Sequence, residues 1–429
     1  MQKTFLKFVV YELIERIARF DRLLNDCADE PEKVSPGLVT ALARQSLALK
    51  TQLLADQAFL NELFTDTPIP DNSMRHWLKD EFGAHYETLR RMAATLTPLY
   101  KGTVLPETFL FLKEAMPTDL LADSPEVAVV ATPEGEVDPL HGLRLSDDVL
   151  VSRLPLLQRN NPLGWTSLVR AFAVRLSKEA PALTAVRARV KKVLNSDDAL
   201  TDALFAHSLA LRLMGPAYYF ASLADAVFQK DADFLNWIEP ALFVGLNHQG
   251  MTAKSLVILH EALDRSKDVL LKCWGRDEDG VVDKDMLAAF FHAVEKAVPD
   301  KHAFTQKQFD RAQALQDRLA QGTLLSASPL YPTEEVAEYL DDVRANDKFS
   351  IYDALSRVTE YPHTPREVVN AGWVHKMERA PVWLYSTVAV QGEDYDGFDR
   401  LRELVDGYDG LLQKSIETSE VHRILLVTA

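Results

Sequence analysis

A histidine and a glutamate stand side by side in the segment "SLVILHEALDRSKDVL", at His260 and Glu261. With Asp264 they form the pattern H-E-x-x-D, which puts His260 and Asp264 one turn apart on the same face of a helix. Imidazole nitrogen and carboxylate oxygen both bind Zn²⁺, so this pair could contribute to a metal site. No third ligand follows at a usual spacing. We therefore expect an ordinary polar helix face here.

An acidic segment, "GRDEDGVVDKDML", resembles part of a calcium-binding loop. Gly280 would take the turn position of such a loop, and Asp277 and Asp279 would take ligand positions three and five. Gly275, however, stands at the first ligand position and Met286 at the twelfth, where a bidentate carboxylate is required. The segment therefore predicts an acidic turn that caps the next helix.

Other catalytic patterns are missing from the sequence. It contains no G-x-S-x-G elbow, no P-loop and no G-x-G-x-x-G fingerprint. Its two cysteines, Cys27 and Cys273, are too few for a disulfide framework or a zinc site made of several thiolates, and we expect buried thiols in a reducing compartment. The remaining histidines are scattered and suggest no catalytic triad: His141, His248, His302, His363 and His375. The sequence predicts no cofactor and no metal.

The stretch "ALFAHSLALRLMGPAYYF" at residues 203–220 is the most informative one. Pro216 lacks an amide donor and its ring crowds the preceding turn, so a helix bends or stops there. Gly215 allows a neighbouring helix to approach closely. Tyr218 and the two aromatic residues beside it offer a large apolar area next to the bend. A kinked core helix explains these residues, and His207 lies on the turns before the kink.

The elements that position these residues are mostly helices. Apolar residues at helical spacing predict helices over residues 2–26, from Ser35 to about residue 64, and over 72–99. Such long amphipathic helices predict an N-terminal helical bundle, residues 1–100.

Residues 101–160 form a mixed segment. Its β-branched stretch at 126–136 predicts a short strand, and "DDVLVSRLPLL" predicts a second strand or an extended segment. Residues 161–429 are helical nearly to the end. The predicted fold class is mostly α, with a small β element.

Part of the chain resembles a family of largely uncharacterised helical proteins with a zinc metallopeptidase motif. In that family a proline-rich approach leads into a helix with H-E-x-x-H, and a later helix carries E-L-x-A-D followed by G-P-A-Y. Residues 154–183 resemble the first helix and its approach, and residues 202–220 resemble the second. Residues 364–376 and 411–423 resemble the closing segments, so the resemblance covers about residues 150–429. It implies a helical metallopeptidase-like body.

The same resemblance implies that the metal site is lost. Arg170 and Val174 stand where the two histidines belong, and Ala171 stands where the glutamate belongs. Ala203 takes the third-ligand position and His207 the aspartate position, while Gly215, Pro216, Ala217 and Tyr218 match G-P-A-Y. The fixed positive charge of an arginine opposes a divalent cation. We expect the helices 163–179 and 198–214 to pack with these residues facing each other, and Arg170 to pair with Asp202.

Charge narrows the choice of partners. The chain of 429 residues carries a net charge of −16, which disfavours direct binding to nucleic acid. The basic stretch "VRARVKKVL" at 186–194 fits a solvated helix face. No segment reaches the length of about 20 apolar residues that spans a bilayer, and charged residues interrupt the N-terminal apolar stretch. The sequence predicts a cytoplasmic protein.

Three hypotheses for the function follow. The first is a pseudoenzyme, a non-catalytic metallopeptidase-like protein that binds protein partners as a scaffolding or regulatory subunit of a multi-subunit complex, with bacterial antiviral defence as one context. The second is a metal-dependent hydrolase with a relocated site made of His207, His260 and Glu261. The third is a helical adaptor unrelated to peptidases, in which the helices 163–179 and 198–214 need not pair.

Overall fold

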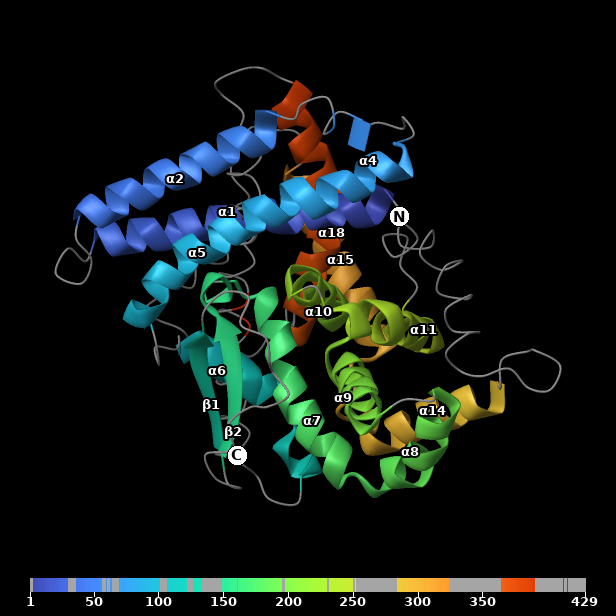
Figure 1. Cartoon of the computed structure of the whole chain (residues 1–429). Helices are drawn as coiled ribbons and strands as arrows, with labels where there is room; N and C mark the ends of the chain where they lie inside the picture. Colours follow the sequence, from blue (N-terminus) through green and yellow to red (C-terminus); the bar gives the residue numbers. More distant parts are fainter. Residues whose placement is uncertain are drawn as a thin grey trace.

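The computed structural model describes residues 3–29, 36–55, 69–100, 106–121, 126–132, 149–159, 161–194, 197–229, 231–249, 284–323 and 364–389, with the single residues 59, 62, 63, 251, 412 and 415. Helices dominate this part of the chain (Figure 1), which confirms the predicted mostly α fold class. Within these ranges no helix combines the length and apolar character needed to cross a membrane.

The N-terminal helices begin close to the predicted positions, but the second ends at Ala55, where the prediction ran to about residue 64. They are α1 (Lys3–Ala28), α2 (Pro36–Ala55), α4 (Asp71–His76), the π-helical turn η1 (Trp77–Phe82) and α5 (Gly83–Tyr100). α1 packs against α2 and α5 (Figure 1), as expected for a bundle of long helices. The helix predicted over 72–99 therefore exists, with a π-helical turn near its start.

α1 is buried almost all the way round. Every residue from Phe8 to Phe20 is buried, and these include Glu12, Glu15 and Arg16. α1 contacts not only α2 and α5 but also η3 (Leu156–Gln158), α10 (Pro216–Gln229) and α18 (Pro365–Ala389). A helix in this position must find partners for its charged side chains inside the protein, because unpaired buried charges are costly.

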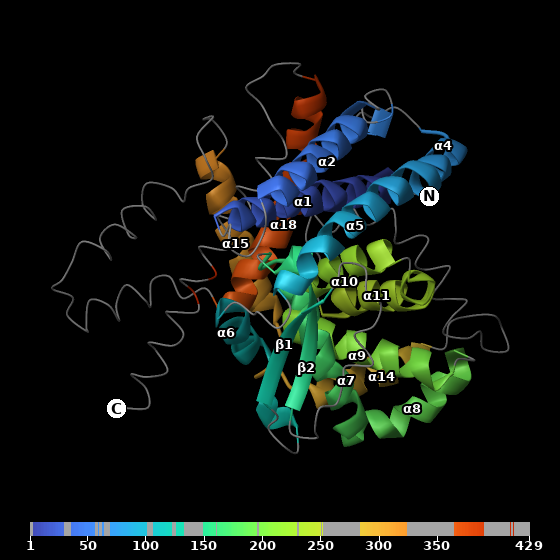
Figure 2. The same cartoon turned by 60° about the vertical axis from the view of Figure 1, so that its left-hand side comes forward.

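Two short parallel strands make up the β element. β1 (Glu126–Thr132) pairs with β2 (Val149–Pro155) in a register that runs from Glu126 opposite Val149 to Thr132 opposite Pro155. The strands lie between α6 (Pro106–Ala115) and α7 (Val169–Glu179) (Figure 2). Both predicted extended segments are confirmed as strands.

The rest of the described chain is a helical body. After the 3₁₀ turns η2 (Thr118–Leu120), η3 and η4 (Gly164–Leu168), it consists of α7, α8 (Pro181–Leu194), α9 (Asp198–Met214), α10, η5 (Phe234–Ile238), α11 (Glu239–His248), α14 (Lys284–Ala297), α15 (Gln306–Thr323) and α18. α7 and α9 pack against each other along their length, as predicted for the helices 163–179 and 198–214. One hydrophobic core runs from α1 into this body.

Candidate functional site

The Gly-Pro pair separates two helices. α9 ends at Met214, Gly215 adopts a positive φ of 68°, and α10 begins at Pro216. A β-carbon on Gly215 would lie 2.2 Å from the ring of Phe304, so space and backbone conformation both require glycine. Proline suits the first position of a helix, where its missing N–H is not needed. The predicted kink in one helix is thus a stop and a restart.

Asn370 of α18 joins the two helix ends. Its side-chain Oδ1 accepts a hydrogen bond of 2.8 Å from the backbone N–H of Ala217, near the start of α10. Its Nδ2 donates to the carbonyl of Met214, the last residue of α9, also at 2.8 Å. Helix ends leave such groups without partners, and here one side chain from a distant segment satisfies one at each end.

The residues matched to the family motif lie on two helices that pack against each other, α7 and α9. We call Arg170, Ala171, Val174, Ala203 and His207 the α7–α9 site. Arg170, Ala171 and Val174 on α7 are half-buried, whereas Ala203 and His207 on α9 are buried, with His207 only 1 % exposed. The α7 residues follow one another at the spacing of one helix face, so this face of α7 is the partly accessible side of the site.

The predicted pairing of Arg170 with Asp202 is wrong. Asp202 forms a short ion pair with Arg187 of α8. Arg187 also donates 2.6 Å to the carbonyl of Ser177, and its guanidinium carbon lies 5.2 Å from the ring centroid of Phe205. Because α8 packs on α9, Arg187 reaches Asp202 and leaves Arg170 to other neighbours.

His207 is held by α10. Its Nδ1 lies 2.9 Å from the hydroxyl oxygen of Tyr218, and its ring packs edge-on against Phe234 at a centroid distance of 4.9 Å. Its Nε2 is buried and has no hydrogen-bond partner. Burial, helped by the positive charge of Arg170, lowers the pKa of His207 well below its ordinary value. His207 is therefore neutral at physiological pH.

Three residues on one face of α10 complete the polar surroundings, and two of them, Ser222 and Asp225, were not predicted from the sequence. Tyr218, Ser222 and Asp225 follow the i, i+4, i+7 spacing of a helix face. Burial raises the pKa of Tyr218 to about 12, although the charge of Arg170 and the neighbouring Ser222 hydroxyl act in the opposite direction. The spacing of polar residues in an otherwise apolar helix was the available signal for Ser222 and Asp225.

Asp225 links this region to α1. Its Oδ1 accepts a hydrogen bond of 3.0 Å from Nη2 of Arg16. Burial raises the pKa of Asp225, while Arg16, Ser167 and the nearby charge of Arg170 act in the opposite direction. Asp225 thus has one cationic side chain from α1 and another from α7 close to it.

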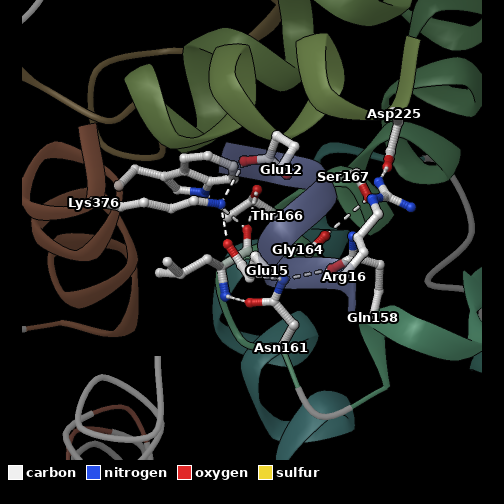
Figure 3. A network of polar contacts seen from close by, with 12 residues as sticks. Glu12, Glu15, Arg16, Gln158, Asn161, Gly164, Thr166, Ser167, Asp225 and Lys376 are labelled. Atoms are coloured by element: carbon white, nitrogen blue, oxygen red, sulfur yellow. Dashed lines mark hydrogen bonds and ion pairs between the residues drawn. The ribbon is translucent and has the colours of Figure 1, made fainter. Parts of the chain in front are cut away.

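A second group of charged residues surrounds Glu12 and Glu15, which lie next to Arg16 on α1 (Figure 3). Lys376 of α18 reaches α1 and forms short ion pairs with both Glu12 and Glu15. Its Nζ also lies 4.5 Å from the ring centroid of Trp373. Asn161 donates 2.8 Å to Oε1 of Glu15, which ties the segment before η4 to the same cluster. We call Glu12, Glu15, Asn161 and Lys376 the Lys376 cluster.

The Lys376 cluster holds more negative than positive charge. One ammonium group faces two carboxylates, and all three side chains are no more than 3 % exposed. Burial and the neighbouring Glu15 raise the pKa of Glu12 to about 7, although Lys376 and Arg16 favour its ionised form. The two carboxylates raise the pKa of Lys376 despite its burial. A proton on Glu12 would balance the cluster.

Some of the other features predicted from the sequence lie within the described residues, and the rest lie outside them. Trp373 is a core residue, stacked on Phe220 with a ring-centroid distance of 5.6 Å, and Cys27 is buried, as predicted. The segment with His260, Glu261 and Asp264 lies outside the described residues, as does Cys273. Of the acidic stretch that begins at Gly275, the structure describes only the start of α14.

The donor set of the α7–α9 site is poor in metal ligands. Arginine, alanine and valine supply no lone pair for a cation, and Nδ1 of His207 is occupied by Tyr218. Within the described ranges no three His, Cys, Asp or Glu residues gather closely enough to hold a metal ion. The arrangement instead offers hydrogen-bond donors and positive charge at Arg170.

Comparison with known proteins gives no match. No family model, no curated protein and no solved structure matches this chain.

Proposed function

We propose that this chain is a non-catalytic protein with a metallopeptidase-like body that binds protein partners as a scaffolding or regulatory subunit of a cytoplasmic complex. The observation that carries this proposal is the placement of Arg170. Its charge acts on His207, Tyr218 and Asp225, and in the proposed alignment with the family motif Arg170 takes the place of the first metal ligand. A permanent cation at that place disfavours a divalent metal and favours an anionic group of a partner.

The state of His207 supports the same proposal. A hydrolytic site needs a base that can take up a proton near neutral pH. Burial and Arg170 make the neutral form of His207 more stable, and Tyr218 occupies its Nδ1. His207 is therefore poorly suited to accept a proton during catalysis.

Accessibility of α7 supports a binding role. Ser167, Arg170, Ala171 and Val174 are half-buried and lie along one face of η4 and α7. The helices beneath are held by buried hydrogen bonds such as those of Asn370, so this face is presented by a fixed framework. A fixed surface loses little conformational entropy when a partner binds.

Crosslinking in the cells of origin tests this proposal. A photo-crosslinking amino acid replaces Ala171, on the accessible face of α7, and in a control protein it replaces Gln45, which is exposed on α2. The proposal predicts a discrete adduct with one or a few proteins from position 171 and none of these from position 45. Mass spectrometry identifies the adducts.

The alternatives predict different results. Zinc that resists dialysis in near-stoichiometric amount, with peptide cleavage that a chelator abolishes, would support the relocated hydrolase. A folded protein that gives no adduct at position 171 would support an adaptor whose partners bind elsewhere.

A further inference from the structure

We propose that the outward face of α2 is a surface at which two copies of this chain pair across a twofold axis. This pairing does not depend on the function proposed above, which concerns α7. α2 (Pro36–Ala55) lies on the outside of the N-terminal bundle (Figures 1 and 2), and its inward side packs on α1 and α5. Among the described elements, only α1 and α5 make extensive contact with it.

The two sides of α2 differ in exposure. Its inward side buries Leu42, Leu49 and Leu53, which follow one another at helical spacing. Its outward face consists of the exposed residues Thr40, Ala41, Arg44, Leu47, Ala48, Thr51 and Ala55. Leu47 is 65 % exposed, more than any other large apolar side chain that the structure describes. A single exposed leucine is common on protein surfaces, so charge and spacing must decide what this face does.

The outward face of α2 carries almost no charge. Asp and Glu supply 63 of the 429 residues, yet the 20 residues of α2 contain neither. Of its two cations, Lys50 pairs with Asp21 at 2.5 Å, and only Arg44 lies on the outward face. Two copies with a net charge of −16 each repel one another. Here they could meet without opposing carboxylates, and depletion of charged residues is typical of the centre of an interface.

The spacing of the outward residues makes this face complementary to itself. When two identical helices cross antiparallel at a twofold axis, residues equally distant from the axis face each other. With the axis at the middle of the face, the facing pairs are Leu47 with Ala48, Arg44 with Thr51, and Thr40 with Ala55. In each pair the larger side chain meets a smaller one of the second copy, as close packing of two helices requires. The outward face therefore fits a second copy of itself.

The length of α2 limits the strength of this dimer. A helix of 20 residues is about 30 Å long and, with its side chains, about 10 Å wide. Two such helices bury less than the roughly 800 Å² per partner of a standard protein–protein interface. We therefore expect a dissociation constant of about 0.1 mM, as for transient contacts. Added salt screens the repulsion between the two acidic chains, so the dimer should become stronger at high ionic strength.

Analytical ultracentrifugation of the full chain tests the inference. Sedimentation equilibrium is measured from about 10 μM to about 1 mM protein, at about 0.05 M and about 0.5 M NaCl. We expect a monomer–dimer equilibrium that stops at the dimer, because a twofold contact closes on itself, and that shifts towards the dimer at high salt. A protein that remains monomeric at about 1 mM, or that forms open-ended oligomers, would overturn the inference.

Three variants assign the dimer to this face. Leu47→Glu places two carboxylates beside the axis and should weaken the dimer by about tenfold or more. Thr51→Glu brings a carboxylate to Arg44 of the second copy, whereas Thr51→Arg brings a like charge there. We expect the first of these two to strengthen the dimer and the second to weaken it by about threefold, as for exposed ion pairs. Within one copy, Arg44 and Thr51 are two turns apart, about 10 Å, so an effect on association is intermolecular.

The control is Ala185→Glu, which adds the same charge at an exposed position of α8 and should leave the dimer nearly unchanged. Circular dichroism identifies variants that remain folded. A dimer that folded Leu47→Glu leaves intact, or equal effects of Thr51→Glu and Thr51→Arg, would overturn the inference. The crosslinking control at Gln45 stays interpretable, because an adduct of two copies has twice the chain mass of 48.2 kDa and is thereby distinguished from a foreign partner.

Discussion

At the scale of single residues, Gly215 shows why a Gly-Pro pair interrupts this apolar stretch. Its positive φ lets the chain leave α9 and enter α10 within one residue. Its missing side chain makes room for Phe304, whose backbone N–H donates 2.8 Å to the carbonyl of Arg212 in the last turn of α9. The segment before α15 is thereby joined to the end of α9.

Gly215→Ala is expected to destabilise the protein. The alanine must adopt a left-handed conformation, which costs about 1–3 kcal/mol, and its methyl group also collides with the Phe304 ring. Gly245→Ala is the matched control, because Gly245 lies within α11 and its added methyl meets the end of the Leu211 side chain at 3.1 Å. Urea unfolding measures the free energy of unfolding of both variants. Equal losses of stability would contradict this role of Gly215.

At the scale of elements, the Lys376 cluster fastens α1 to α18. Its ion pairs join distant parts of the sequence, and Lys376 and Glu12 are separated by 364 positions. Arg16 and Asp225 add a second connection, from α1 to α10, with an N–O distance of 3.0 Å. These buried pairs fix the rotation of α1, because turning the helix would leave charged groups unpaired in the core.

The excess negative charge of the Lys376 cluster predicts a pH dependence. The pKa of Glu12 is raised from 4.5 to about 7 in the folded chain. An acid with a raised pKa stabilises the fold fully below its unfolded pKa, and this contribution is lost as the pH rises through its folded pKa. Relative to Glu12→Gln, the wild type should therefore lose about 3 kcal/mol of unfolding free energy between about pH 4.5 and pH 8.

Chemical denaturation at several pH values measures this difference. Glutamine stays neutral throughout and can still accept a hydrogen bond from Lys376, so the variant isolates the titration of Glu12. Glu62→Gln, at an exposed position, is the control and should follow the wild-type curve. A constant difference between wild type and Glu12→Gln across this range would refute the predicted titration.

Removing the ammonium group of Lys376 is expected to destabilise the protein more than removing one of the two carboxylates. Lys376→Met leaves Glu12 and Glu15 buried without their partner, which should cost about 3–5 kcal/mol at neutral pH. Lys301→Met is the control, because Lys301 pairs with Asp119 at the surface and should cost less than about 1 kcal/mol. Thermal unfolding compares the stability of these two variants with that of the wild type. Similar effects would show that the Lys376 cluster does not hold α1 in place.

At the scale of the whole molecule, the bundle and the body share one core. α1 packs against α2 and α5, and it also contacts α10 and α18 of the body (Figures 1 and 2). The core residues form a continuous cluster through both parts. The N-terminal helices therefore stabilise the body that carries the α7–α9 site.

Much of this fold could be predicted from the sequence, because its signals are local. Helical periodicity predicted α1 and α5, and β-branched residues predicted β1. The pairing of α7 with α9 followed from the resemblance, and it is confirmed.

Contacts between distant segments could not be predicted in the same way. Nothing near Asp202 indicates that Arg187 of α8 reaches it before Arg170, since helix packing decides that competition. Likewise, Glu12 and Glu15 have no local feature that points to Lys376. Asn370 caps both α9 and α10 only because α18 docks at the Gly-Pro break.

The zinc content of a variant with the metal ligands added tests our main proposal most directly, namely that the α7–α9 site has a metallopeptidase-like framework in which Arg170 replaces a ligand. The variant combines Arg170→His, Ala171→Glu, Val174→His and Ala203→Glu, and it is dialysed and analysed by mass spectrometry beside the wild type. We predict about one zinc ion per chain in the folded variant and none retained by the wild type. A wild type that retains stoichiometric zinc, or a folded variant that binds none, would contradict the account.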